Sequence, residues 1–231
     1  VYETKDHLDN LDLSRATYWQ LNASNRFVPK GSHVNTITKP SMERNRLLTR
    51  MAVTPRGRPI YSSGSILDFV AGIQDAIKGH EGLVGKGILH GDVCEEKIVL
   101  LKTTSDKDMH GMLTGLEHSV KIKDNLAKDY EHILTGNLKF MALERLKNFS
   151  LTGEVIRRTC RHDLESFFYV FIVGCIEYGK VSESKDNSLN DWCRKDLKMN
   201  FMCKAYYVMS SEMLEKFTPS FEGLKGLGII L

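Results

Sequence analysis

Residues 87–120 read "GILHGDVCEEKIVLLKTTSDKDMHGMLTGLEHSV", and this stretch decides the fold class. A short apolar run leads into His90-Gly91-Asp92. Two further apolar runs, "KIVLLK" and "HGMLTGL", follow with the polar segment "TTSDKDM" between them. Apolar runs separated by a polar loop predict a β-hairpin. The polar groups of His90 and Asp92 are therefore expected just before the hairpin, on a loop.

Helical patterns flank this hairpin on both sides. Upstream, Phe69, Val70, Ile73 and Ile77 recur at helical spacing and predict an amphipathic helix. Downstream, "LESFFYVFIVGCIEYG" has an uncharged part of 11 residues, too short for the ~20 that span a bilayer. It predicts a helix buried on all sides, beginning near Asp163, whose carboxylate suits an N-cap.

The order of these elements predicts an α+β fold in which helices and strands are segregated. A helix, a hairpin and an irregular loop are followed by several helices, and the last forty residues predict two of these. The connector "TPRGRPIYSSGS" is rich in Pro, Gly and Ser and marks the start of the helical part. We place the division of the chain at residue 62, with segments 1–62 and 63–231.

Composition excludes several classes of protein. The 231 residues are 42% hydrophobic and 26% charged, with a net charge of +3, too small to predict nucleic-acid binding. Arg157, Arg158 and Arg161 cluster, which indicates a solvated face. Five cysteines without paired spacing indicate a reducing compartment, and the first residues lack the apolar segment of a signal peptide. We expect an intracellular, cytoplasmic location without membrane attachment, and secretion of a longer precursor is left open.

An ordered set of motifs resembles the fungal-type protein kinase domain. "GILHGDVCEEKIVL" is similar to that family's "GILHRDIS..NI" catalytic loop, and "GMLTGLEHSV" to its "G.LIDFDLA" metal segment. "TGNLKFMALERL" resembles "TGT..FMA.E.L", and "RTCRHDLESFFYVFIVGCI" resembles "RHDLESFFYVL". The resemblance spans roughly residues 42–226, and it depends on the ordered set because isolated motifs match by chance.

The resemblance implies a protein-kinase-like fold, mainly the helical C-lobe with a small catalytic-loop hairpin. Residues 1–62 then hold the N-terminal segment and a remnant of the N-lobe and hinge, while residues 63–231 form the helical C-lobe. No glycine-rich loop followed by a V-A-I-K lysine precedes residue 47. The N-lobe is therefore expected to be truncated or rebuilt.

Four residues match positions that the family retains. Asp92 takes the place of the catalytic base, and His90 that of a structural histidine in the same loop. Glu144 corresponds to the Glu of the A-P-E segment. Asp163 corresponds to the Asp that begins the central buried helix and anchors the catalytic loop through charge-assisted hydrogen bonds.

The departures from the family pattern concern the chemistry. Gly91 replaces an Arg, Lys97 the metal-binding Asn, and Gly115 the metal-binding Asp. Mg²⁺ requires oxygen ligands, which neither Lys97 nor Gly115 supplies. Electrostatic stabilisation of this kind contributes about 3 to 4 kcal/mol per donor. The resemblance therefore implies an idle base and no metal ligand among the matched residues.

Lys97 and Glu117 each allow two interpretations. Lys97 is an exposed lysine at the start of a strand, or its ammonium binds a phosphate directly without metal. Glu117 is a glutamate in a surface turn, or a replacement metal ligand two residues beyond Gly115.

Three functions remain open. The first is a catalytically impaired pseudokinase that acts as a binding or scaffold module for an unidentified protein, without a cofactor. The second is a weak or atypical Ser/Thr protein kinase that uses ATP, Mg²⁺ and Asp92 as base. The third is a truncated kinase remnant without function. Neither nucleic acid nor a membrane is an expected partner.

Overall fold

The computed structural model describes residues 57–102, 110–123, 134–153, 155–178, 187–210 and 212–230. These residues all belong to one compact unit, Met51–Leu231. Residues 1–56 of the expected N-lobe remnant, including the segment upstream of residue 47, lie outside the described residues. The division at residue 62 therefore stays a prediction.

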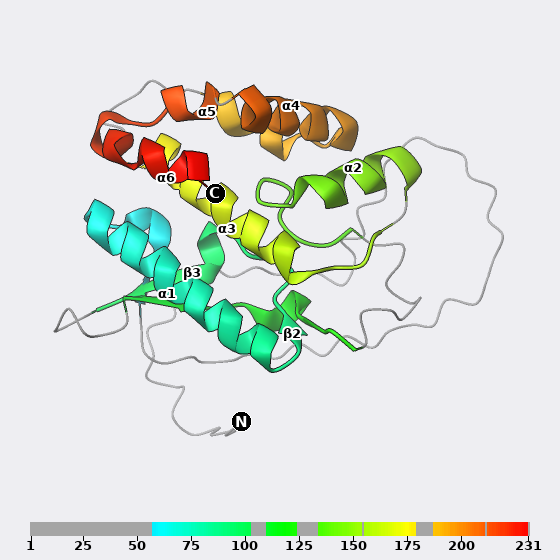
Figure 1. Cartoon of the computed structure of the whole chain (residues 1–231), viewed down its shortest axis with the longest axis horizontal. Helices are drawn as coiled ribbons and strands as arrows, with labels where there is room; N and C mark the ends of the chain where they lie inside the picture. Colours follow the sequence, from blue (N-terminus) through cyan, green and yellow to red (C-terminus); the bar gives the residue numbers. More distant parts are fainter. Residues whose placement is uncertain are drawn as a thin grey trace, which may run out of the picture. The chain divides into compact units, whose positions relative to one another are not determined.

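The described elements confirm an α+β chain. The strands are β1 (Gly57–Pro59), β2 (Ile88–Leu89), β3 (Ile98–Leu101), β4 (Gly111–Leu113) and β5 (Val120–Lys121). The α-helices are α1 (Ile66–Gly85), α2 (Leu143–Thr152), α3 (Cys160–Glu177), α4 (Leu197–Ser210), α5 (Glu212–Glu215) and α6 (Lys225–Ile230). Figure 1 shows α3 running between α1 on one side and α4 and α5 on the other.

The strands form two small antiparallel sheets. In the first, β3 lies between β1 and β4, with Ile98 opposite Leu113. In the second, β2 pairs with β5, with Leu89 opposite Val120. The predicted hairpin is thereby confirmed as β3 and β4, although its loop, 103–109, lies outside the described residues. The β2–β5 pair joins the two ends of the 87–120 stretch and brings His90 close to the residues that follow β4.

Helix α1 confirms the amphipathic prediction and packs directly on β4. The Ser65 hydroxyl caps it by accepting a hydrogen bond from the Asp68 amide, and Phe69, Ile73 and Ala76 are buried. The approach between helix and strand is close. A Cβ on Gly111 would lie 2.6 Å from the Cα of Gly72, so the contact requires glycine.

Helix α3 forms the centre of the core, as predicted. Every residue from Tyr169 to Ile176 is buried. Its beginning was predicted wrongly, because the cap is Thr159, which forms a capping box with His162. Asp163 lies inside the first turn instead, and its carboxylate is therefore free to reach the loop after β2. None of the described helices is long and apolar enough to cross a membrane.

The C-terminal part contains one more α-helix than predicted, because α4, α5 and α6 replace the expected two. Lys204 fixes α4 to the chain before α2. Its Nζ is fully buried and donates to the carbonyl oxygens of Lys139 at 2.9 Å and Met141 at 2.7 Å. The ammonium also lies 3.5 Å from the centre of the Tyr169 ring. Burial holds the pKa of this lysine well below its ordinary value.

Candidate functional site

Asp163 organises the loop that contains the candidate catalytic residues. Its Oδ2 accepts hydrogen bonds from the His90 amide at 2.9 Å and from His80 Nε2 at 3.0 Å, and its Oδ1 accepts from the Gly91 amide at 2.9 Å. Burial alone would raise the pKa of this carboxyl, but these hydrogen bonds outweigh it and lower the pKa. The carboxylate therefore remains ionised inside the core and holds the loop by charge-assisted bonds.

The His90 ring connects the loop to the end of β4. Its Nε2 lies 2.9 Å from the carbonyl oxygen of Thr114, while its Nδ1 lies 3.3 Å from the Asp92 amide. A carbonyl only accepts and an amide only donates, so the ring is the neutral tautomer with the proton on Nε2. Burial lowers the pKa of this histidine and keeps the ring neutral. The arrangement is structural, and it matches what the resemblance implies for His90.

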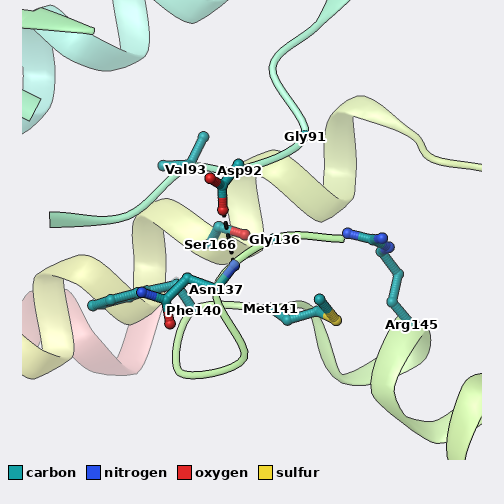
Figure 2. Close-up of a pocket in the computed structure, with 9 residues that line it drawn as sticks. All are labelled: Gly91, Asp92, Val93, Gly136, Asn137, Phe140, Met141, Arg145 and Ser166. Carbon is teal, nitrogen blue, oxygen red and sulfur yellow. Dashed lines mark hydrogen bonds between the residues drawn. The ribbon is translucent and has the colours of Figure 1, made fainter. Parts of the chain in front are cut away.

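Asp92 lies at the mouth of a small pocket, with its carboxylate already engaged. Its Oδ1 accepts a hydrogen bond from the Asn137 amide at 2.8 Å, and its Oδ2 lies 4.0 Å from His118 Nε2. Figure 2 shows the Asp92 carboxylate directed at Asn137, with Arg145 at the other edge of the pocket. The lining residues are Gly91, Asp92, Val93, Gly136, Asn137, Phe140, Met141, Arg145 and Ser166. The cavity of about 10 Å³ is at the lower limit for one water molecule.

Lys97 and Glu117 form an ion pair over Gly115. Lys97 and Gly115 stand at the two positions where the resemblance expects metal ligands, and Glu117 lies two residues beyond Gly115. Lys97 Nζ donates to Glu117 Oε1. Gly115 has a left-handed φ of 82°, and a Cβ there would lie 2.9 Å from Lys97 Nζ. The lysine side chain thus occupies the volume that an aspartate at 115 would need. The two departures from the family pattern are therefore sterically coupled.

The electrostatics of this pair favour its charged form. Partial burial would lower the pKa of Lys97, but the Glu117 carboxylate and the more distant Asp92 outweigh it and raise the pKa. Burial likewise opposes ionisation of Glu117, and the hydrogen bond from Lys97 reverses this and lowers its pKa. The site therefore carries its own cation, and the Glu117 carboxylate is paired with it.

The residues present do not fit a resident Mg²⁺. The ion takes oxygen ligands, whereas Lys97 contributes an ammonium and Gly115 has no side chain. Among the residues that the structure describes, no group of three His, Cys, Asp or Glu side chains is placed to hold a metal.

Arg158 lies against Gly91, where the family has its arginine. Gly91 has a φ of 79°, and a Cβ there would lie 2.8 Å from the His118 carbonyl oxygen and 3.1 Å from the Arg158 Cζ. Arg158 Nη1 donates to that carbonyl at 2.7 Å, and its Nη2 donates to the Thr135 hydroxyl. The interpretation of Arg158 as part of a solvated face was therefore wrong. A guanidinium from the segment before α3 occupies the place next to Gly91.

The guanidinium of the buried Arg145 lies close to that of the half-buried Arg158. Arg145 Nη2 donates to the Thr135 carbonyl oxygen at 3.3 Å. Burial, together with repulsion from Arg158, lowers the pKa of Arg145 to about 10. The charge of Arg145 is balanced at longer range by Asp163 and Asp92. Sequence reasoning missed both guanidinium contacts, because their partners are backbone carbonyls and Thr135, which carry no motif.

Glu144 lies apart from Asp92 and Lys97. It is exposed in the first turn of α2, pairs with Arg161, and accepts from His162 Nε2 at 3.0 Å. The hydrogen bond from His162 lowers the pKa of this carboxyl. Glu144 therefore joins the beginning of α2 to the beginning of α3, a structural contact rather than a site contact.

A comparison with family models relates the site to known proteins. The model described as fungal protein kinase matches residues 3–175, three quarters of the chain. The match begins before residue 42, where the motif comparison began, and ends at α3. No curated protein matches the chain.

Proposed function

Because the chain belongs to the fungal protein kinase family, we propose that it is a pseudokinase, a kinase-like domain without metal-dependent phosphoryl transfer. In this proposal it acts as a binding or scaffold module. The proposal depends on one observation above all, the Lys97–Glu117 ion pair over Gly115.

Phosphoryl transfer develops negative charge that the site must neutralise. In family members with the full motif, metal ions held by Asn and Asp oxygens bridge the phosphates and neutralise that charge. Here a lysine fills the same region and is itself neutralised by Glu117. A compact ammonium that is already paired supplies neither the coordination geometry nor the net charge of a divalent ion. Asp92 alone then has no activated phosphate to which it could direct a hydroxyl.

The buried groups around the loop support a role that needs the fold rather than the chemistry. His80, His90 and Asp163 form a buried, satisfied hydrogen-bond network. Such networks fix a local conformation when every member is satisfied. A domain that keeps this network but fills its metal positions with an ion pair suits binding through its surface.

The test is transfer of labelled phosphate from ATP to a general acceptor protein, with Mg²⁺ and with Mn²⁺. The matched control is Asp92→Asn, which removes the base and retains the hydrogen-bond acceptor for Asn137. We expect no more incorporation from the native chain than from Asp92→Asn. Incorporation that disappears in Asp92→Asn would establish the alternative of a weak kinase and overturn the proposal.

An unfolding experiment distinguishes the proposed binding module from the alternative of a truncated kinase remnant. A module that binds through its surface must be folded, so the chain is expected to unfold in one cooperative transition in denaturant. A gradual, non-cooperative loss of helical signal would favour a remnant instead.

A further inference from the structure

Helix α4 presents an apolar stripe to solvent on the face opposite its packed side. Asn200 and Lys204 are buried on the inner side. Met199, Met202, Tyr206 and Met209 point outward, with 40%, 52%, 57% and 84% of their surfaces exposed. A surface helix normally turns polar residues outward. An exposed apolar face that runs the length of a helix indicates a contact with another macromolecule.

The spacing of the stripe specifies what kind of surface fits it. The four residues are separated by three, four and three positions, the spacing of a coiled-coil seam. At 3.6 residues per turn they lie within about 80° of arc, so the stripe is straight and narrow. A second helix is the element that fits such a stripe, because its own side chains enter the gaps between successive residues.

The same spacing is unchanged when the helix is read backwards. A two-fold symmetric contact requires a self-complementary surface, in which each pair of residues occurs twice. From this we propose that α4 packs antiparallel against α4 of a second copy of the chain. Met202 then lies opposite Tyr206 of the second copy, and Met199 lies opposite Met209 of the second copy.

The charges at the two ends of the stripe favour this orientation. Lys198 flanks the N-terminal end and is exposed. Glu212 lies near the C-terminal half, where the Tyr206 hydroxyl donates to its Oε1 at 2.6 Å. Asp196, also at the N-terminal end, is committed to the amides of Lys198 and Met199 as a helix cap. An antiparallel pair brings Lys198 of each copy toward Glu212 of the other, whereas a parallel pair places like charges together.

The size of the stripe sets the strength of the contact. Covering the four side chains removes on the order of 900 Å² from two copies together, slightly less than the ~1,000 Å² at which specific interfaces begin. The dimer is therefore weak and concentration-dependent. Its formation does not depend on the state of the Lys97 site, so the inference stands or fails separately from the proposed function.

Sedimentation velocity of the full chain from about 5 to 500 µM tests the inference across the range where a weak dimer forms and dissociates. We expect the native chain to shift toward a dimer with concentration. Met202→Glu places a charge in the centre of the seam and is expected to weaken association about tenfold or more. The matched control is Leu67→Glu on α1, at an apolar residue that is more exposed than Met202 and does not belong to the stripe.

A mixture of two variants tests the orientation. Chains with Met202→Glu and chains with Tyr206→Lys each associate weakly alone, but mixing them places opposite charges face to face in the antiparallel pair. Recovery of association in the mixture supports the arrangement. A native chain that stays monomeric throughout overturns the proposal, as does a dimer that Met202→Glu leaves intact. If Met202→Glu fails to fold, Met209→Ala at the most exposed residue of the stripe replaces it.

Discussion

The two ends of one loop have opposite electrostatic character. At His90 and Gly91, the buried Asp163 carboxylate accepts three hydrogen bonds and keeps its charge. At Lys97, seven residues later, an ammonium occupies the region where the family pattern places metal ligands, and Glu117 neutralises it. The first end has kept the groups that hold the loop in place. The second has Lys97 and Gly115 in place of the metal ligands, and the Lys97 ammonium is the cation there.

The groups at the first end stabilise the fold, whereas the groups at the second end stand where the reaction requires metal ligands. The Asp163 network is buried, so its loss exposes donors to a site without water and destabilises the protein. The Lys97–Glu117 pair is partly exposed, so its effect on stability is small and its main consequence concerns metal binding. Changes at the two ends are therefore expected to produce different readouts.

The largest effect is expected from Asp163→Ala. The change leaves His80 and the amides of His90 and Gly91 without their acceptor in the core, which costs about 3 to 5 kcal/mol of unfolding free energy. Denaturant unfolding measures it. Asp191→Ala, which removes a carboxylate paired with Arg194 at the surface, is the control and should change stability by less than about 0.5 kcal/mol. Equal effects of the two changes would contradict the anchoring role.

Acid titration of the native chain examines the same network without mutation. Because the pKa of Asp163 is lowered on folding, its stabilisation is complete above 3.8, the ordinary pKa of an aspartate. It is lost as pH falls from there through the lower folded value. Unfolding free energy should thus decrease more steeply below pH 4 in the native chain than in Asp163→Asn. Parallel curves would show that this carboxylate contributes nothing through its ionised form.

An intermediate effect is expected from Gly91→Arg, which restores the residue of the family pattern. The left-handed backbone and the Arg158 guanidinium both oppose a side chain there, at a cost of about 2 to 3 kcal/mol. Combining it with Arg158→Ala should recover part of the loss, since the crowding disappears. If Arg158→Ala gives no relief, Arg158 does not occupy the place of the missing arginine.

Gly115→Asp is expected to cost about 1 to 2 kcal/mol, because it adds a side chain at positive φ against Lys97. In a Lys97→Asn background the cost should fall, and a double-mutant cycle measures this coupling. Mg²⁺ should stabilise the double variant and neither single variant. Additive effects of the two changes would refute the steric coupling at this end of the loop.

The smallest effect is expected from Lys97→Ala. The pair with Glu117 is partly exposed and screened by solvent, so its removal should cost less than about 1 kcal/mol, with dependence on salt. Lys78→Ala, at an exposed lysine paired with Asp75, gives the scale of an ordinary surface pair. A loss of several kcal/mol would place Lys97 with the structural residues instead.

Local patterns predicted the elements because each has a local cause. The spacing of Phe69 and Ile73 indicated α1, and the run from Tyr169 to Ile176 indicated α3. Both signals are patterns of apolar residues within one segment of the sequence. The start of α3 was misplaced: Thr159 and Asp163 are both good caps, and the capping box of Thr159 with His162 begins the helix before Asp163.

Only the site residues that belong to a sequence motif could be predicted. His90, Asp92, Lys97 and Asp163 follow from the resemblance, whereas His80 and Arg158 reach the same loop from distant segments. Their roles arise from packing, and no spacing rule connects residue 80 or 158 to residue 91. Lys204 is a further case. No sequence pattern predicts that this helical lysine is buried in contact with two backbone carbonyls and an aromatic ring.

Thermal unfolding of the native chain with millimolar ATP, in the presence and absence of Mg²⁺, tests the central claim most directly. A ligand at about 100 times its dissociation constant adds roughly 2.7 kcal/mol of stability, a readily measured shift. We expect Mg²⁺ to add no stabilisation beyond that of ATP alone, because Lys97 and Glu117 already fill the metal region. A shift that requires Mg²⁺ would contradict this, and it would show that the second end of the loop still holds a metal ion.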